Sequence, residues 1–256
     1  MSISLSEDYE DYLESIALIE ANELTEEQYI GFLDHMENIP STRSPISGNV
    51  ARLCFEFMED TGCRATETIH VRKKDIDYRT NILTVTHPKT HARCKCSKWK
   101  YADMFSRRQV LASVDKTCTV CHGVGTWKKP QHTTFTPRLI TKLKAYTDTL
   151  QNDDLLFPVD RTTLWRWAKK AGIRAKINIF QQKRERKIEG IFLHLFRALC
   201  SKRTTAIAKD DKYKDAIVMR KMRHSYKVVT DRYTEITIGY LVSFERRIYG
   251  KNSIPS

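Results

Sequence analysis

Apolar residues recur at spacings of three and four along most of the chain, a pattern that predicts mainly helical structure. The clearest case predicts a helix from Ser47 to Asp60 that ends at Thr61-Gly62, with Gly62 as its left-handed cap. The apolar stripe of this helix consists of Val50, Leu53, Cys54, Phe57 and Met58. The same periodicity predicts later helices over residues 137–150, 162–172, 191–208, 213–222, 228–233 and 238–249.

The remaining segments predict one more helix and a few strands. A helix is expected to begin at Leu24-Thr25, with Thr25 as N-cap and an acid at the third helical position to form a capping box. Alternation predicts a strand over 82–86 after a turn at 77–81, and a further strand resumes at 133–136. The Lys- and Arg-rich segment 181–187 is expected to be a loop or a frayed helix end. The fold class is therefore α+β, mainly helical, with a small antiparallel sheet.

Residues 91–131 interrupt this pattern and contain two close pairs of cysteines, Cys94 with Cys96 and Cys118 with Cys121. The second pair continues as His122-Gly123-Val124-Gly125, so that the segment looks like a zinc knuckle. Four thiolates in two pairs suit tetrahedral zinc, and a segment so poor in apolar residues needs such a ligand to fold. The sequence therefore predicts an inserted module that binds structural zinc through these four cysteines.

Alternatives to this metal site remain open at the level of sequence. The four thiols can be reduced and unligated in a loose insertion, and His91 or His122 can replace one cysteine as a ligand. The other three cysteines, Cys54, Cys63 and Cys200, are expected to pack in the core.

Charge is divided unevenly along the chain. Eleven of the 31 acids and none of the 44 Lys and Arg residues lie within residues 1–40, so the rest of the chain carries a net +24. A body this basic favours a polyanionic partner, most simply double-stranded DNA. The chain has neither a run long and apolar enough for a membrane span nor the layout of a secretory signal. A cytoplasmic, nucleoid-associated location is therefore expected.

The candidate chemistry lies in six scattered polar residues. Breaking a DNA strand without a metal requires a nucleophile, cations around the phosphate and a proton donor for the leaving oxygen. A tyrosine phenol can attack, guanidiniums can clasp the charged phosphate oxygens, and a lysine can protonate the 5′ oxygen. The candidates for these roles are Arg64, Lys89, His194, Arg197, His224 and Tyr233.

The order and settings of these residues resemble the catalytic domain of the tyrosine recombinases (phage-type integrases). Thr61 to Glu67 matches the family's Thr-Gly-x-Arg-x-x-Glu turn, and Lys89 fits the place of its hairpin lysine. His194 and Arg197 match its helical His-x-x-Arg pair. His224 with Tyr233 matches its Leu-Gly-His element and late tyrosine, although Arg223 stands where the family usually has glycine.

The resemblance implies a role for each residue. Arg64 and Arg197 would clamp the scissile phosphate, Lys89 would be the general acid, and Tyr233 would be the nucleophile. His194 and His224 would add hydrogen bonds, and Glu67 would orient Arg64 through a salt bridge. No cofactor is implied for the chemical step.

The implied protein is a site-specific DNA recombinase, such as the integrase of a mobile element, that forms a covalent 3′-phosphotyrosine. Two alternatives are a type IB topoisomerase and a catalytically inactive DNA-binding regulator with the same fold. Four parts are expected: an acidic N-terminal arm (1–23), a catalytic domain (24–240), the inserted zinc module (91–131) and a C-terminal tail (241–256).

Two further expectations concern assembly on DNA. The family's helical core-binding domain has no counterpart in the 23 residues before Leu24, so the basic insertion is expected to act as an extra DNA grip. The amphipathic helix after Tyr233 is expected to dock either on its own chain or on a neighbouring subunit of a homo-oligomer.

Overall fold

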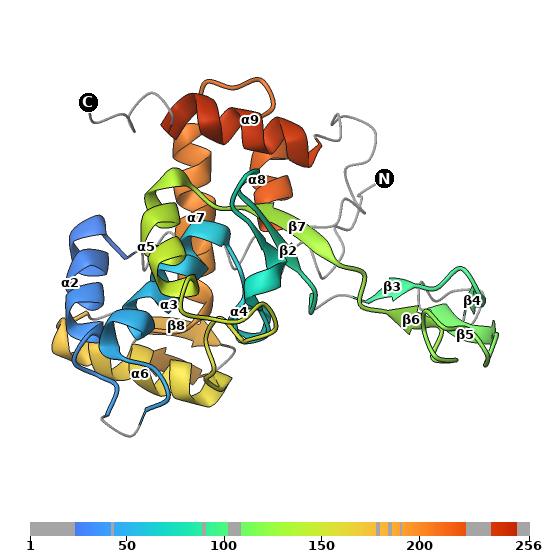
Figure 1. The fold of residues 1–256 in the computed structure, drawn as a ribbon, viewed down its shortest axis with the longest axis horizontal. Coiled ribbons are helices and arrows are strands. Elements are labelled where there is room, and N and C mark those ends of the chain that lie inside the picture. The colour runs from blue at the N-terminus through green and yellow to red at the C-terminus, as the bar shows by residue number, and fades with distance from the viewer. Residues whose placement is uncertain are drawn as a thin grey trace.

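The computed structural model describes residues 24–41, 44–88, 91–101, 109–177, 180–183, 186–189, 191–223 and 237–249. Helices build most of the body, small antiparallel sheets complete it, and the predicted α+β class is confirmed (Figure 1). The helices are α2 (Glu26–Met36), α3 (Gly48–Thr61), α4 (Ala65–Thr68), α5 (Pro137–Thr147), α6 (Arg161–Arg174), α7 (His194–Ile207), α8 (Lys214–Met222) and α9 (Ile238–Tyr249), with a 3-10 turn at Lys73–Asp75.

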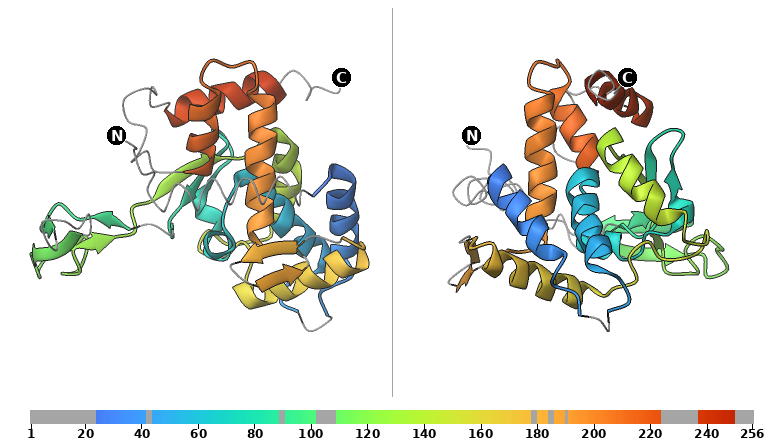
Figure 2. Two further views of the ribbon diagram at one scale, coloured as in Figure 1. Left: turned by 180° about the vertical axis from the view of Figure 1, so that it is seen from behind. Right: turned by 60° about the vertical axis from the view of Figure 1, so that its left-hand side comes forward.

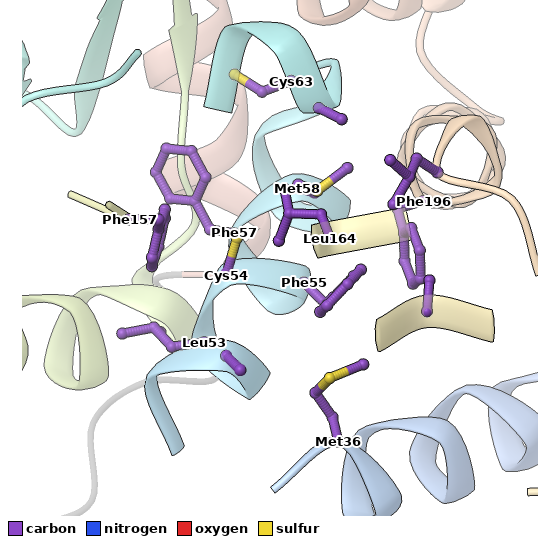
Figure 3. Close-up of a cluster of buried hydrophobic side chains, with 14 of the residues drawn as sticks. Met36, Leu53, Cys54, Phe55, Phe57, Met58, Cys63, Phe157, Leu164 and Phe196 are labelled. Carbon is purple, nitrogen blue, oxygen red and sulfur yellow. The ribbon is translucent and has the colours of Figure 1, made fainter. Parts of the chain in front are cut away.

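Helix α3 lies at the centre of the larger core (Figure 3). The Ser47 hydroxyl caps its first turn and Gly62 ends it at φ +63°, as the sequence predicted. Its apolar side chains project on more than one side, because Phe55 packs against Phe196 while Phe57 packs against Phe157. The helix is therefore enclosed by α2, α5, α6 and α7 rather than buried along a single stripe.

Helix α2 begins with the expected capping box, but its third residue is an amide. The Thr25 hydroxyl accepts from the backbone N–H of Gln28, and the Gln28 side chain accepts from the Thr25 N–H. The prediction of an acid at this position was wrong by one residue, because Glu26 and Glu27 occupy the first two helical positions. Gln28 satisfies the same free donor that an acid would satisfy.

A three-stranded antiparallel sheet flanks α3 and α4. Its order is β1 (Ile76–Asp77), β2 (Ile82–Val85) and β7 (Gln131–Thr134), with Leu83 opposite Thr133. The predicted turn at 77–81 is confirmed, with the Asp77 carboxylate accepting from the next residues and Asn81 at positive φ. The residues that pair between β2 and β7 are about fifty positions apart in the sequence. The strands described between β2 and β7 lie outside the body.

That intervening segment forms a projecting arm. In the views of Figures 1 and 2 it extends away from the helical body as a narrow unit. It contains two short antiparallel pairs, β3 (Ala92–Arg93) with β6 (Thr126–Trp127) and β4 (Ser97–Tyr101) with β5 (Gln109–Val114). We call residues 91–131 the arm. It interrupts the helical periodicity, as predicted, because its structure is short ladders with few buried apolar residues.

A second hairpin corrects the sequence interpretation. Residues 181–187 were expected to be a loop or helix end, but β8 (Phe180–Lys183) pairs with β9 (Arg186–Glu189) between α6 and α7. A strand is recognised in a sequence by alternating apolar and polar residues, and this charged segment lacks that alternation. The hydrogen bonds that pair the two strands leave no other local signal.

Helix α9 packs on its own chain across α8. Its Leu241 and Phe244 share a small core with Ala208, Ala216 and Ile217. Glu245 forms a buried ion pair with Lys221 of α8 at 2.6 Å, and Lys221 also donates to the carbonyl and hydroxyl of Thr134. Of the two docking modes left open by the sequence, this structure has the one within the chain. No helix among the described residues is long and apolar enough to cross a membrane.

Candidate active site and metal centre

The turn from Thr61 to Arg64 connects α3 to α4 and lies against the first half of α7 and the C-terminal end of α8. Gly62 sits at φ +63°, and a Cβ added there would lie 2.6 Å from Met222 Cε and 3.2 Å from Cys200 Sγ. Thr133 of β7 donates its hydroxyl to the carbonyls of Thr61 and Lys221. The turn is thereby fixed between two helices and the sheet.

Arg197 reaches this turn from the first half of α7. Its guanidinium donates to the backbone carbonyls of Gly62 and Met222, and its side chain is buried. Burial, with the nearby positive charges of Arg223 and Arg64, lowers the pKa of Arg197 to about 9. The predicted pair of Arg64 and Arg197 is therefore brought into one electrostatic neighbourhood.

Arg64 is held by Glu67, as the sequence predicted. Its Nη1 lies 2.9 Å from Glu67 Oε1, and its backbone N–H donates to Oε2 at 2.8 Å. Burial opposes ionisation of Glu67, but Arg223, the Arg64 amide and the Arg64 guanidinium outweigh it and lower the pKa of this carboxyl. The Arg64 side chain remains 25% exposed, whereas the side chains of Arg197 and Arg223 are buried, so solvent reaches the Arg64 guanidinium most.

Arg223 is a member of the site that the sequence analysis did not propose. Its Nη2 lies 2.6 Å from Glu67 Oε2, and its guanidinium also donates to the carbonyls of Thr61 and Gly62. The only signal in the sequence was the replacement of a customary glycine by arginine. We call Arg64, Arg197 and Arg223 with Glu67 the arginine cluster.

Of the other four predicted site residues, the structure describes only His194. His194 is the first residue of α7 and is exposed, while Arg197, three positions later, is buried against the turn. Lys89, His224 and Tyr233 lie outside the described residues. The described chain reaches Pro88 before the first of these and Arg223 before the second. Their roles stay predictions.

The chemistry available to the arginine cluster follows from its charge. Three guanidiniums face one carboxylate, which leaves two formal positive charges in excess at a mostly buried point. Such an excess favours a bound anion, and guanidiniums match the geometry of phosphate oxygens. The cluster is thus suited to hold a phosphodiester approaching from the exposed side of Arg64.

The four cysteines of the arm form a second candidate site. Cys94 Sγ lies 3.7 Å from Cys118 Sγ, Cys96 Sγ lies 3.4 Å from Cys121 Sγ, and all four sulfurs are within 4.8 Å of one another. Tetrahedral zinc with bonds near 2.3 Å would separate its sulfurs by about 3.8 Å. The N–H of Gly125, at φ +81°, donates to Cys121 Sγ. These donors are close enough to hold one metal ion.

The other cysteines behave as predicted. Cys54, Cys63 and Cys200 are buried in the body as free thiols. Burial raises the pKa of Cys200 to about 12, which keeps its thiol protonated and suited to packing.

Comparison with known proteins gives structural similarity without a sequence match. No family model and no curated protein matches the chain. The chain is similar to XerA recombinase at 15% identity and a TM-score of 0.47, over 91% of this chain and 65% of that one. It is also similar to the XerH site-specific recombinase bound to its difH substrate, at 16% identity and a TM-score of 0.45, over 91% of this chain and 52% of that one.

A third similar structure is the Tn1549 transposon integrase in complex with transposon right end DNA. The identity is 14% and the TM-score 0.44, over 86% of this chain and 60% of that one. The chain thus spans between about half and two thirds of these structures.

Replacing Gly62 tests how tightly the turn is held. Gly62→Ala adds a Cβ at positive φ and against Met222 and Cys200, so we expect it to lower the free energy of unfolding by about 2 kcal/mol. The control is Gly31→Ala in α2, where a Cβ meets nothing within 4 Å and should stabilise by about 0.5–1 kcal/mol. Denaturant unfolding measures both, and equal effects would contradict the described packing.

Proposed function

We propose that the chain is a site-specific DNA recombinase of the tyrosine recombinase type, similar to an integrase. The observation that carries the proposal is that Arg197, distant in sequence, donates to the turn that carries Arg64. The guanidinium of Arg64 is partly exposed there. Two excess positive charges at this point favour a DNA backbone phosphate.

The proposed reaction is a transesterification. The Tyr233 phenol gives up its proton to solvent and its oxygen attacks the scissile phosphorus, the bond to the 5′ oxygen breaks, and a 3′-phosphotyrosyl bond forms. Lys89 gives a proton to the departing 5′ oxygen, while Arg64 and Arg197 stabilise the charge that gathers on the non-bridging oxygens. His194 and His224 add hydrogen bonds to the same phosphate. Because the phosphotyrosyl bond conserves the energy of the broken bond, the reverse attack by a 5′ hydroxyl reseals the strand without ATP.

A nicked suicide substrate tests the nucleophile. The nick releases a short oligonucleotide after cleavage, so the chain should accumulate as a covalent protein–DNA adduct that Tyr233→Phe abolishes. Tyr240→Phe is the matched control, because Tyr240 belongs to α9 and contacts Asp211 and Tyr213. Denaturing gel electrophoresis measures the adduct. An adduct that persists in Tyr233→Phe would refute the assignment of this tyrosine.

The alternatives give different results with the same protein. A type IB topoisomerase would relax supercoiled plasmid as a monomer, whereas a recombinase would exchange strands between two sites. A DNA-binding regulator would bind DNA and form no adduct, and that result would reject the enzymatic proposal.

The arm is proposed to be a zinc-binding module. Its four sulfurs are separated by distances close to those of a tetrahedral zinc centre, and two of them, Cys94 and Cys121, are buried within a unit that has little other core. Zinc bound there would supply the folding energy of the arm and would take no part in strand cleavage.

Metal analysis tests this centre. The purified chain should contain about one zinc ion, and Cys121→Ser should lose most of it because one of four ligands is gone. Cys54→Ala removes a buried thiol of the body and should leave the zinc content unchanged. Equal zinc contents in the two variants would contradict the site.

The arm is further proposed to grip DNA. Seven of its described residues are exposed cations, against the single acid Asp115: Arg93, Lys95, Lys98, Lys100, Lys116, Lys128 and Lys129. Arg93 also stacks over the ring of Trp99. The arm that carries this charge projects from the helical body as a narrow unit (Figure 1), so its cations could reach DNA that extends beyond the body.

Salt dependence measures this contribution. Replacing Lys98, Lys100, Lys128 and Lys129 by alanine should weaken DNA binding and reduce the slope of log affinity against log salt by about 0.9 for each phosphate that the arm no longer neutralises. The matched control replaces four exposed cations on and just after α6: Arg161, Arg166, Lys170 and Lys176. If the arm variant has the same slope as the unmodified chain, the arm does not contact DNA.

A further inference from the structure

The backbone of Arg223 adopts an uncommon conformation for a residue with a long side chain. It ends α8 in the left-handed region, at φ +55° and ψ +37°. Residues with a Cβ rarely occupy this region unless other contacts hold them there. At Asn81, another such position, the residue type itself favours the conformation, but arginine has no such preference.

The Arg223 backbone N–H bonds back to α8, whereas its side-chain hydrogen bonds within the described part of the chain go to the turn that carries Arg64 and to Glu67 of α4. Its Nη1 donates to the Thr61 carbonyl at 3.3 Å, and its Nη2 donates to the Gly62 carbonyl at 3.2 Å and to Glu67 at 2.6 Å. The side chain is 2% exposed. A long, charged side chain is therefore withdrawn from solvent to join the end of α8 to the start of α4.

Glu67 passes this contact on to Arg64. One carboxylate oxygen accepts from the Arg64 guanidinium, and the other accepts from the Arg64 amide and from Arg223. The plane of the carboxylate is thus fixed by Arg223 on one side, and that plane sets the direction of the Arg64 guanidinium on the other. Since Arg64 is the more exposed guanidinium, its direction decides how a phosphate is met.

The local charge supports the same role. Arg223 Nε has no hydrogen-bond partner within the described part of the chain, although it is buried. The pKa of Glu67 is lowered despite its burial because Arg223 and Arg64 face it. Arg223 thus keeps the carboxylate ionised while adding to the excess positive charge of the cluster.

We propose that Arg223 is a positioning residue, which fixes Glu67 and, through it, aims the Arg64 guanidinium at a DNA backbone phosphate. The proposal rests on the proposed function and adds to it a link between α8, which leads to His224, and the turn that carries Arg64.

Two variants at this position separate positioning from folding. Arg223→Gly suits the backbone conformation and removes the side chain, so the chain should fold while adduct formation slows by about 10- to 100-fold. Arg223→Lys keeps the positive charge near Glu67 and should restore part of the rate. A rate of Arg223→Gly equal to that of the unmodified chain would overturn the proposal.

The pH profile of adduct formation distinguishes positioning from a purely structural role, because the loss of a purely structural residue would not shift the profile. The charged groups facing Glu67 are Arg64 from the turn, Arg197 from α7 and Arg223 from α8, with the Cys63 thiol beside them. Without Arg223 the pKa of Glu67 rises, so the carboxylate becomes protonated at a higher pH than in the unmodified chain. A protonated Glu67 no longer forms the ion pair that holds Arg64. The acid limb should therefore move to higher pH in Arg223→Gly and return in Arg223→Lys. A slower reaction with an unmoved limb in both variants would overturn the proposal.

A DNA-binding cycle keeps this inference separate from the proposed function. If the unmodified chain forms no adduct, the enzymatic proposal fails and binding decides the role of Arg223. Arg64→Ala should then weaken binding to duplex DNA several-fold less in the Arg223→Gly background than alone, since Arg64 is already misdirected there. Equal losses in the two backgrounds would show that Arg223 does not position Arg64.

Discussion

The site depends on a buried set of hydrogen bonds between guanidiniums and the backbone carbonyls of one turn. Arg197 joins Gly62 to Met222, and Arg223 joins Thr61 and Gly62 to Glu67. These bonds give hydrogen-bond partners to the carbonyls of Gly62, which ends α3, and of Met222, which ends α8, and add a second donor to the Thr61 carbonyl that Thr133 also reaches. The same groups that organise the turn therefore supply its positive charge, so the proposed binding of a phosphate would be coupled to the folding of the turn.

The other side of the turn is organised by a separate polar network. Asp60, at the end of α3, accepts from the backbone N–H and hydroxyl of Thr136, while Lys221 is paired with Glu245 of α9. Thr133 connects the two through the carbonyls of Thr61 and Lys221. A buried Lys221 left without Glu245 would cost stability. Helix α9 is thus connected to the turn through Lys221 of α8, which pairs with Glu245 and whose carbonyl accepts from Thr133.

Local signals in the sequence were sufficient for the helices that lie among the described residues and for one half of the site, whereas the helix expected over 228–233 lies outside those residues. Gly62 ended α3 as expected, and the motif from Thr61 to Glu67 correctly indicated the ion pair of Arg64 with Glu67. The β8–β9 hairpin was missed because pairing across a charged hairpin has no periodicity. Arg223 was missed because its role depends on a positive φ and on contacts with residues more than a hundred positions earlier, neither of which the sequence displays. Lys89, His224 and Tyr233 lie outside the described residues and stay predictions.

The position of the arm in the chain links its proposed grip to the arginine cluster. The arm leaves the body after β2 and returns through β7, and these strands are hydrogen-bonded to each other, so its base is held by the three-stranded sheet. Thr133 of β7 also contacts the turn beside Arg64. A duplex held by cations on the arm would therefore be oriented relative to the turn through a short, hydrogen-bonded path. In the proposed complex, exposed lysines of the arm would supply salt-dependent attraction, while the partly exposed Arg64, held by the buried Glu67 and Arg223, would contact a single phosphate.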